Sequence, residues 1–166
     1  TIVSQLCENG ALIVSGGALG IDTIAHRTAI ECGGKTVLVM GCGHGSGYLP
    51  ENSMLRKRVA ENGALITEFP PFYNVTHGSF PQRNRIISGM SSGVVISEAA
   101  KFSGTFSTAR HAMNQGRTIF VLPGDIKSGN YEGSNQLIIE GAKPVFSAAD
   151  IIPGAKVSYS YIINKS

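Results

Sequence analysis

Residues 11–40 read ALIVSGGALGIDTIAHRTAIECGGKTVLVM and contain a complete strand, helix and strand. The aliphatic run Ala11–Val14 is typical of a buried strand, and a glycine turn follows it. Residues Ile21–Glu31 have the length of a helix, and Thr36–Met40 is a second apolar run. Two strands joined by a helix in this way lie parallel in one sheet. The stretch therefore predicts a βαβ unit.

The same alternation continues along the chain. Further strands are expected at Ala64–Thr67, Gly93–Ile96 and Thr118–Leu122, and further helices at Glu51–Glu61, Asn84–Met90, Thr105–Asn114 and Ser134–Ile139. Gly33, Gly63 and Gly116 follow three of the helices and suit a left-handed residue there. The pattern predicts an α/β fold: a Rossmann-like, doubly wound, mostly parallel sheet with helices on both faces. Ligands of such folds bind at the carboxyl ends of the strands.

Composition narrows the class of protein. The 166 residues are 42% hydrophobic, with a formal net charge of +3, which permits but does not demand binding to a polyanion. The three cysteines lack the spacing of a disulfide framework or a zinc ribbon. We expect a cytoplasmic protein with no membrane partner, metal or cofactor. We also expect one domain over residues 1–153, cut from a longer protein, with a tail or linker at 154–166.

A first glycine loop follows the strand at Ala11–Val14 and opens the helix at Ile21. Amides and the helix dipole attract phosphate at such a position. The candidate phosphate-binding residues are Ser15, Gly16, Gly17 and Gly20. Ser15 stands where a dinucleotide fingerprint has its first glycine, so NAD binding is disfavoured. A tight turn without a ligand is the plain alternative.

Two other groupings favour structural roles. Cys42 beside His44 in the loop 41–48 could indicate a nucleophile or a metal site, but further ligands at suitable spacing are missing, which favours a flexible loop. Asp22 and His26 lie four residues apart on one helix and could form a hydrogen-bonded pair. No nucleophile is identifiable beside them, so a structural pair is expected.

The segment 77–89, HGSFPQRNRIISG, combines an aromatic residue, two guanidinium groups and a helix start. Arginine forks onto phosphate, and Phe80 could stack on an unpaired base for roughly 1–3 kcal/mol. The candidates here are His77, Gly78, Ser79, Phe80, Arg83, Asn84 and Arg85. Within a helix Arg83 and Arg85 would diverge by about 200°. The alternative is that one arginine pairs with Glu68 or Glu98 while Phe80 caps the core.

A third strand, turn and helix layout spans Glu98 to Arg110. Lys101, Ser103, Gly104 and Thr105 are candidate phosphate ligands at the start of its helix. Capping of that helix by Ser103 or Thr105 is an equally good interpretation.

Taken in order, several segments resemble the DprA/Smf family (DNA processing protein A, DNA-protecting protein). The segments are Val14–Asp22, Gly34-Lys35-Thr36, Tyr48–Asn52, Gly78–Ile87, Glu98-Ala99, Ser103-Gly104-Thr105, Val121–Gly124, Gly133-Ser134-Asn135 and Glu140-Gly141-Ala142. The resemblance implies a homodimer that binds and protects single-stranded DNA during natural transformation and loads the RecA recombinase onto it, without enzymatic turnover. It also implies a DNA pocket built around residues 77–85.

Two departures from the family pattern accompany this resemblance. The family's opening strand, with its Gly-x-Arg turn, should precede Thr1, and His77 stands where the family often has lysine. One rival class is the lysine-decarboxylase-like phosphoribohydrolases, but Thr108 occupies the place of their catalytic glutamate. Another rival class is a nucleotide-sensing or purely assembling module, in which Gly16, Gly17 and Gly104 bind a mononucleotide.

Overall fold

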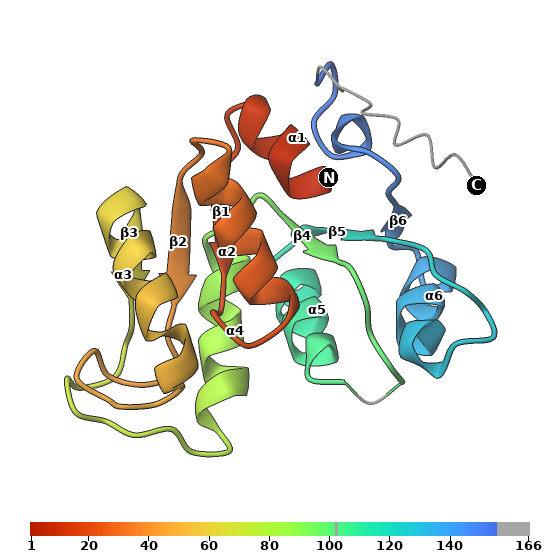
Figure 1. The fold of residues 1–166 in the computed structure, drawn as a ribbon. Coiled ribbons are helices and arrows are strands. Elements are labelled where there is room, and N and C mark those ends of the chain that lie inside the picture. The colour runs from red at the N-terminus through yellow and green to blue at the C-terminus, as the bar shows by residue number, and fades with distance from the viewer. Residues whose placement is uncertain (102, 156–166) are drawn as a thin grey trace, which may run out of the picture.

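The computed structural model describes residues 1–101 and 103–155 and places parallel strands between helices (Figure 1). The expected tail at 154–166 lies mostly outside the described residues. The strands are β1 (Ile13–Ser15), β2 (Thr36–Val39), β3 (Ala64–Ile66), β4 (Gly93–Ile96), β5 (Thr118–Val121) and β6 (Lys143–Pro144). The helices are α1 (Ile2–Glu8), α2 (Ile21–Glu31), α3 (Ser53–Asn62), α4 (Ser79–Gly89), α5 (Thr105–Asn114) and α6 (Glu132–Ile139), with short 3-10 turns at Pro50–Asn52, Gly129–Tyr131 and Ala148–Asp150.

The strands form two parallel sheets of three, in the orders β1-β2-β3 and β4-β5-β6. Val14 pairs with Val37 in the first sheet, and Val94 pairs with Ile119 in the second. Because every pairing is parallel, the carboxyl ends of the strands within each sheet lie at one edge. This arrangement confirms the predicted α/β, Rossmann-like class.

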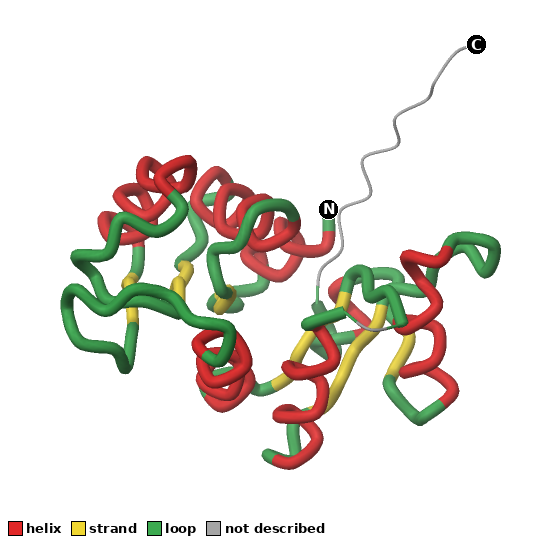
Figure 2. The backbone as a smooth tube through the Cα atoms, turned by 90° about the horizontal axis from the view of Figure 1, so that it is seen from below, coloured by secondary structure: helices red, strands yellow, loops and turns green. Residues whose placement is uncertain are grey.

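Helices cover both faces of the first sheet. α2 and α3 lie on one side of it and α4 on the other (Figure 2). α4 also packs against α5, which covers β4 and β5, so α4 joins the two halves of the molecule. One apolar cluster centres on Leu38, Met40 and Val59, and a second on Ile96 and Val121.

Two sheet edges face a common groove. β1 pairs only with β2, and β4 only with β5, in the part of the chain that the structure describes. A groove of about 1620 Å³ is lined by residues from both strands, including Val14 and Val95. All of β2 is buried, whereas β1 and β3 are only half-buried and Val95 is 38% exposed. The expectation of uniformly buried strands is therefore wrong at these edges, where neighbours lie on one side only.

The helix boundaries differ from the expected ones for local reasons. α4 begins at Ser79 rather than at Asn84, because Pro81 falls in the first turn, where a helix needs no N–H donor. Gly33 and Gly116 have φ of 70° and 66°, which confirms the left-handed prediction. Gly63 has φ of −159°, so the prediction is wrong there. Gly63 is instead needed for space, since a Cβ atom would overlap the carbonyl oxygen of Thr36.

No helix among the described residues is long and apolar enough to cross a membrane.

Candidate functional site

A cavity of about 250 Å³ lies at the carboxyl ends of β1 and β2. The first glycine loop, the start of loop 41–48 and α4 all contribute to its wall. Gly17, Met40, Tyr48, Phe80 and Arg83 are among its lining residues. This is the edge of the sheet at which the alternation of strands and helices predicts a ligand site.

Arg83 is the fixed cation of this site. Its side chain is only 6% exposed, and its guanidinium donates hydrogen bonds to the carbonyl oxygens of Gly16 and Val39. Its Nε donates to Oδ1 of Asn84 at 3.1 Å. Burial lowers the pKa of Arg83, and the negative charge of Asp22 opposes that effect. Arg83 thus ties together the ends of β1 and β2, and only a small part of it reaches the cavity.

Phe80 is held between two neighbours at the mouth of the cavity. Its ring lies 5.6 Å from the Tyr48 ring, centroid to centroid, and the Arg83 guanidinium carbon lies 5.8 Å from its centroid. A cation near an aromatic ring is attracted to its π-electrons. Phe80 also packs against Gly41, and it remains half-buried. The ring is therefore preorganised and still partly open to solvent.

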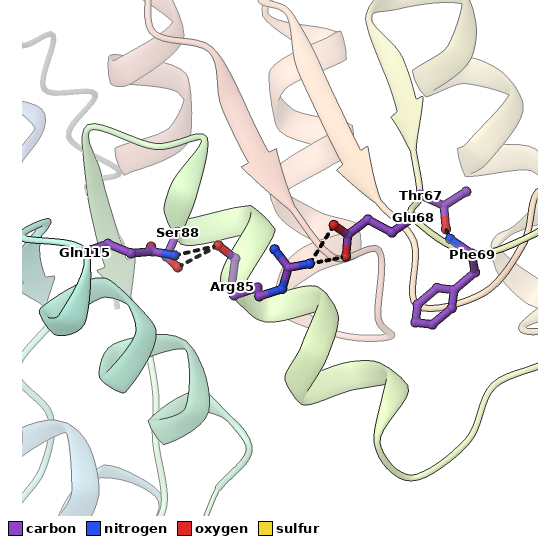
Figure 3. A network of polar contacts seen from close by, with 6 residues as sticks. All are labelled: Thr67, Glu68, Phe69, Arg85, Ser88 and Gln115. Atoms are coloured by element: carbon purple, nitrogen blue, oxygen red, sulfur yellow. Dashed lines mark hydrogen bonds and ion pairs between the residues drawn. The ribbon is translucent and has the colours of Figure 1, made fainter.

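Arg85 points to the opposite side of α4 from Arg83, as the helical spacing predicts. Its guanidinium pairs with the carboxylate of Glu68 at 2.5 Å, and both side chains are exposed (Figure 3). The Gln115 amide donates to the Arg85 carbonyl at 2.9 Å, which links α4 to the end of α5. The interpretation that one arginine pairs with Glu68 is confirmed for Arg85. A phosphate that binds Arg85 would have to displace the Glu68 carboxylate.

The first glycine loop is already fixed by bonds within the chain. Besides the bond from Arg83 to Gly16, the Asn52 amide donates to the Gly17 carbonyl at 2.9 Å. The Ala18 amide donates to the Asp22 carboxylate at 3.1 Å. The negative charge of Asp22 at the start of α2 opposes an incoming anion. Phosphate binding by Ser15, Gly16, Gly17 and Gly20 stays a prediction, while the tight-turn role is visible in the φ of 69° at Gly17 and 92° at Gly20.

His26 is paired, but not with Asp22. Its Nδ1 lies 2.7 Å from the Thr36 hydroxyl oxygen, and that hydroxyl in turn donates to the Ile13 carbonyl. The expected Asp22–His26 pair is therefore wrong, because Asp22 caps the preceding loop instead. His26 is fully buried, and its Nε2 has no hydrogen-bond partner among the described residues. Burial lowers the pKa of His26 to about 4, with a smaller opposing effect of Asp22.

This pKa predicts that acid destabilises the protein through His26. The unfolded histidine takes up its proton near pH 6.5 and the folded one only near pH 4. Between these values the unfolded state binds more protons, so stability is full above pH 6.5 and falls as the pH falls toward 4. The expected loss is on the order of 3 kcal/mol, which urea unfolding at a series of pH values would measure. His26→Gln, which cannot titrate, should show a flatter profile; parallel profiles for the two proteins would contradict the assignment.

The other predicted residues near the start of α4 divide into exposed and internal ones. His77 and Gly78 are exposed on the loop that leads into the helix. Ser79 is buried, and its Oγ accepts a hydrogen bond from the Thr76 amide at 2.9 Å. Ser79 therefore shapes the turn, and only His77 and Gly78 have surface for a ligand.

Of the third predicted segment, Glu98 to Arg110, only some candidate residues line the large groove. Lys101 forms an exposed ion pair with Glu132 at 2.9 Å, and Ser103 has a buried Oγ without a partner among the described residues. No side-chain hydrogen bond within the described chain caps α5, so the capping interpretation of Ser103 and Thr105 is not supported. Gly104 and Thr105 line the large groove together with Ser15, Phe80, Arg83 and Asn84. The groove thus brings together residues from all three predicted segments, whereas His77, Gly78, Ser79, Arg85, Lys101 and Ser103 do not line it.

Sequence reasoning missed the role of the segment after β2. Arg56 donates to the carbonyl oxygens of Tyr48 and Leu49 at 3.0 and 3.1 Å. These bonds hold Leu49 at φ of 53°, a left-handed conformation that is unfavourable for a leucine. The Asn52 amide reaches the first glycine loop. The motif Tyr48–Asn52 carried the family resemblance, but nothing in its residue types indicated these contacts.

Loop 41–48 is hydrogen-bonded to the loop that follows β3. The Gly43 amide donates to the Tyr73 carbonyl at 2.9 Å, and the Gly45 amide donates to the Pro71 carbonyl at 2.6 Å. The loop after β3 therefore supplies backbone partners that a single segment does not reveal, and flexibility of loop 41–48 stays a prediction. No cluster of metal-ligating side chains occurs among the described residues, around Cys42 and His44 or elsewhere.

Comparison with known proteins gives consistent matches. The family model for DNA recombination-mediator protein A matches residues 1–156. DNA processing protein DprA of Streptococcus pneumoniae is 41% identical over 150 residues, which cover 90% of this chain and 53% of that protein. Protein Smf of Escherichia coli is 41% identical over 148 residues, covering 89% of this chain and 40% of that protein. The chain therefore spans about half the length of these relatives, or less.

Two solved structures have the same fold. The crystal structure of DprA from S. pneumoniae superposes with a TM-score of 0.84 at 39% identity, covering 95% of this chain and 56% of that one. DNA processing protein A from Helicobacter pylori, described for its unique single-stranded DNA binding mode, has a TM-score of 0.81 at 33% identity. That match covers 90% of this chain and 68% of the other.

Proposed function

Because this chain belongs to the DNA recombination-mediator protein A family, we propose that it binds single-stranded DNA at the carboxyl ends of β1 and β2. The observation that carries the proposal is the Phe80 ring, which lines the cavity and is only half-buried, with Tyr48 and Arg83 packed beside it. An aromatic ring held in one orientation accepts an unpaired base without demanding a sequence. The H. pylori relative, described for binding single-stranded DNA, supports this assignment.

Each residue of the site has a different proposed role in binding the single strand. Phe80 stacks on a base, and His77 and the amides of Gly78 and Gly104 meet the backbone. Arg83 contributes positive electrostatic potential from beneath the surface and does not reach out to a phosphate, because its guanidinium already donates to the carbonyl oxygens of Gly16 and Val39. Arg85 binds a phosphate only by exchanging it for the Glu68 carboxylate. Duplex DNA binds more weakly, because its bases are stacked and paired.

The proposal extends to the role of the whole protein. The whole protein protects incoming single strands in natural transformation and loads RecA recombinase onto them. It acts in the cytoplasm as a homodimer, without enzymatic turnover. The rival phosphoribohydrolase chemistry needs a glutamate where Thr108 stands in α5. Among the described residues, β1 and β4 each have one unpaired edge, and both edges line the groove between them.

The proposal predicts a clear result for Phe80→Ala. Removing the ring is expected to weaken binding to a labelled oligothymidine by roughly 1–3 kcal/mol, or about 5- to 150-fold, because a stacked base loses its partner. Fluorescence anisotropy at several salt concentrations would measure it. For the wild-type protein, the log–log salt slope should be near −0.7 per neutralised phosphate.

The control is Ile126→Ala, which truncates an equally apolar side chain that is 90% exposed on a distant loop. It should bind as the wild type does. Equal affinities for the wild type and Phe80→Ala would remove the proposed stacking site. Absence of any DNA binding, together with cleavage of a nucleotide, would favour the enzyme alternative.

A further inference from the structure

Phe72 is the most exposed aromatic side chain among the described residues. It lies in the loop that follows β3, and 81% of its surface is accessible to solvent. Single exposed apolar side chains are common on protein surfaces. An exposed ring that is held in one orientation, in contrast, can stack on an unpaired base. No residue role described above uses Phe72.

The loop that carries Phe72 is hydrogen-bonded to a second loop. Loop 41–48 follows β2 and loop 68–78 follows β3, and the two run side by side beyond their strands (Figure 1). Two amides of the first loop, those of Gly43 and Gly45, donate to carbonyls of the second. Ser46 Oγ donates to Asn74 Oδ1 at 3.1 Å, and a Cβ atom at Gly43 would overlap the carbonyl oxygens of Pro70 and Pro71. The close approach therefore depends on glycine.

The Phe72 ring rests on this paired backbone. A Cβ atom at Gly45 would lie about 2.6 Å from the ring, so the ring packs directly against the Gly45 backbone. The same loop contacts Phe80 at Gly41 and ends at Tyr48, which packs against Phe80. Three aromatic residues thus lie along one loop, with Phe80 and Tyr48 at the cavity and Phe72 beyond it.

We propose that Phe72 is a second base-stacking site, which takes an unpaired base of the same single strand that Phe80 holds. This inference rests on the proposed function. A strand lying across loop 41–48 would meet Phe80 first and Phe72 further along. Held against glycine, Phe72 loses little conformational entropy on binding, and successive stacked bases each contribute separately.

The charges around Phe72 favour a nucleic acid strand over a protein as the occupant. Residues 41–48 and 69–78 contain no aspartate or glutamate. The neighbouring carboxylate, Glu68, is paired with Arg85. His44 and His77 are exposed on these two loops and can donate to phosphate oxygens. Hydrogen-bond donors such as His44 and His77, on loops without carboxylates of their own from 69 to 78 and 41 to 48, suit phosphates, and the exposed Phe72 ring suits a base. A nucleic acid strand offers both in alternation.

The test uses this 166-residue chain, its Phe72→Ala and Phe80→Ala variants, and a ladder of oligothymidines of about 5 to 20 nucleotides. Phe72→Ala should bind the shortest oligomer as the wild type does and the longest about 5- to 50-fold more weakly, whereas Phe80→Ala is weakened at every length. Thermal unfolding should show that Phe72→Ala keeps the wild-type fold, since Phe72 is exposed, and affinities of Phe80→Ala are compared at equal folded fraction.

A second variant gives an independent signal. This chain contains no tryptophan, so Phe72→Trp places one reporter on the loop, and a stacked base should quench its emission on binding of the long oligomer. The second site would be overturned if Phe72→Ala bound every oligomer with wild-type affinity and the emission of Phe72→Trp did not change at saturation. The stacking role proposed for Phe80 would then still stand. A wild-type protein that binds no oligomer would overturn the proposed function and this inference together.

Discussion

Replacing Arg83 by alanine is expected to lower the free energy of unfolding by about 4 kcal/mol. The substitution leaves the buried carbonyl oxygens of Gly16 and Val39 without donors, and each unsatisfied buried group costs about 1–3 kcal/mol. It also removes the packing of the side chain against Phe80. Urea denaturation at pH 7 would measure the loss.

Arg85→Ala is the matched control, two residues along the same helix. Its ion pair with Glu68 is exposed, and such pairs contribute at most about 1 kcal/mol. A similar loss for both variants, or a loss below about 1 kcal/mol for Arg83→Ala, would contradict the structural role assigned to Arg83. The contrast also affects DNA-binding experiments. Weaker binding by Arg83→Ala has to be compared at equal folded fraction, whereas Phe80→Ala tests the contact more directly.

Gly63→Ala is expected to destabilise the protein by about 3 kcal/mol or more. The added methyl group would meet the carbonyl oxygen of Thr36, a backbone atom at the start of the central strand β2. Backbone there cannot yield without disturbing the pairing of β2 with β1 and β3. The midpoint of thermal unfolding should therefore fall by many degrees, measurable by circular dichroism.

Gly129→Ala provides the comparison for this substitution. Gly129 has open space where its Cβ would stand, and its backbone is not left-handed. Stability should change by no more than about 0.5 kcal/mol. If Gly63→Ala were as stable as Gly129→Ala, the close approach of Gly63 to Thr36 would not exist in solution.

The sequence alone predicted most of the fold. α2 and α5 have the expected bounds, and each expected strand is found within a residue or two, because apolar β-branched runs and glycine stops are local signals. The motifs from Val14 to Ala142 predicted the family, which the matches confirm. The short strand β6 and the first helix were missed, since neither Lys143-Pro144 nor Ile2–Glu8 carries a distinctive period.

Sequence reasoning found the candidate site by position but not the state of its side chains. The helical spacing of Arg83 and Arg85 predicted that they diverge. It could not show that Arg83 is buried beneath two carbonyls or that Arg85 pairs with Glu68 rather than Glu98. Likewise the glycines of loop 41–48 suggested flexibility but not their partners, since the carbonyls to which Gly43 and Gly45 donate lie in the separate loop after β3.

What the sequence determined by itself was the order of the strands and helices from β1 to α6, the parallel pairing of the strands and the family, because each depends on local periodicity or on motifs in a fixed order. What only the tertiary structure decided was which polar groups were already satisfied. Gly16, Gly17 and Arg83 are candidate ligand-binding residues in the sequence, yet the carbonyls of Gly16 and Gly17 and the guanidinium of Arg83 are bonded to other parts of the chain. Such long-range pairing depends on how strands and helices meet in space, and a buried donor takes whichever acceptor the fold brings within reach.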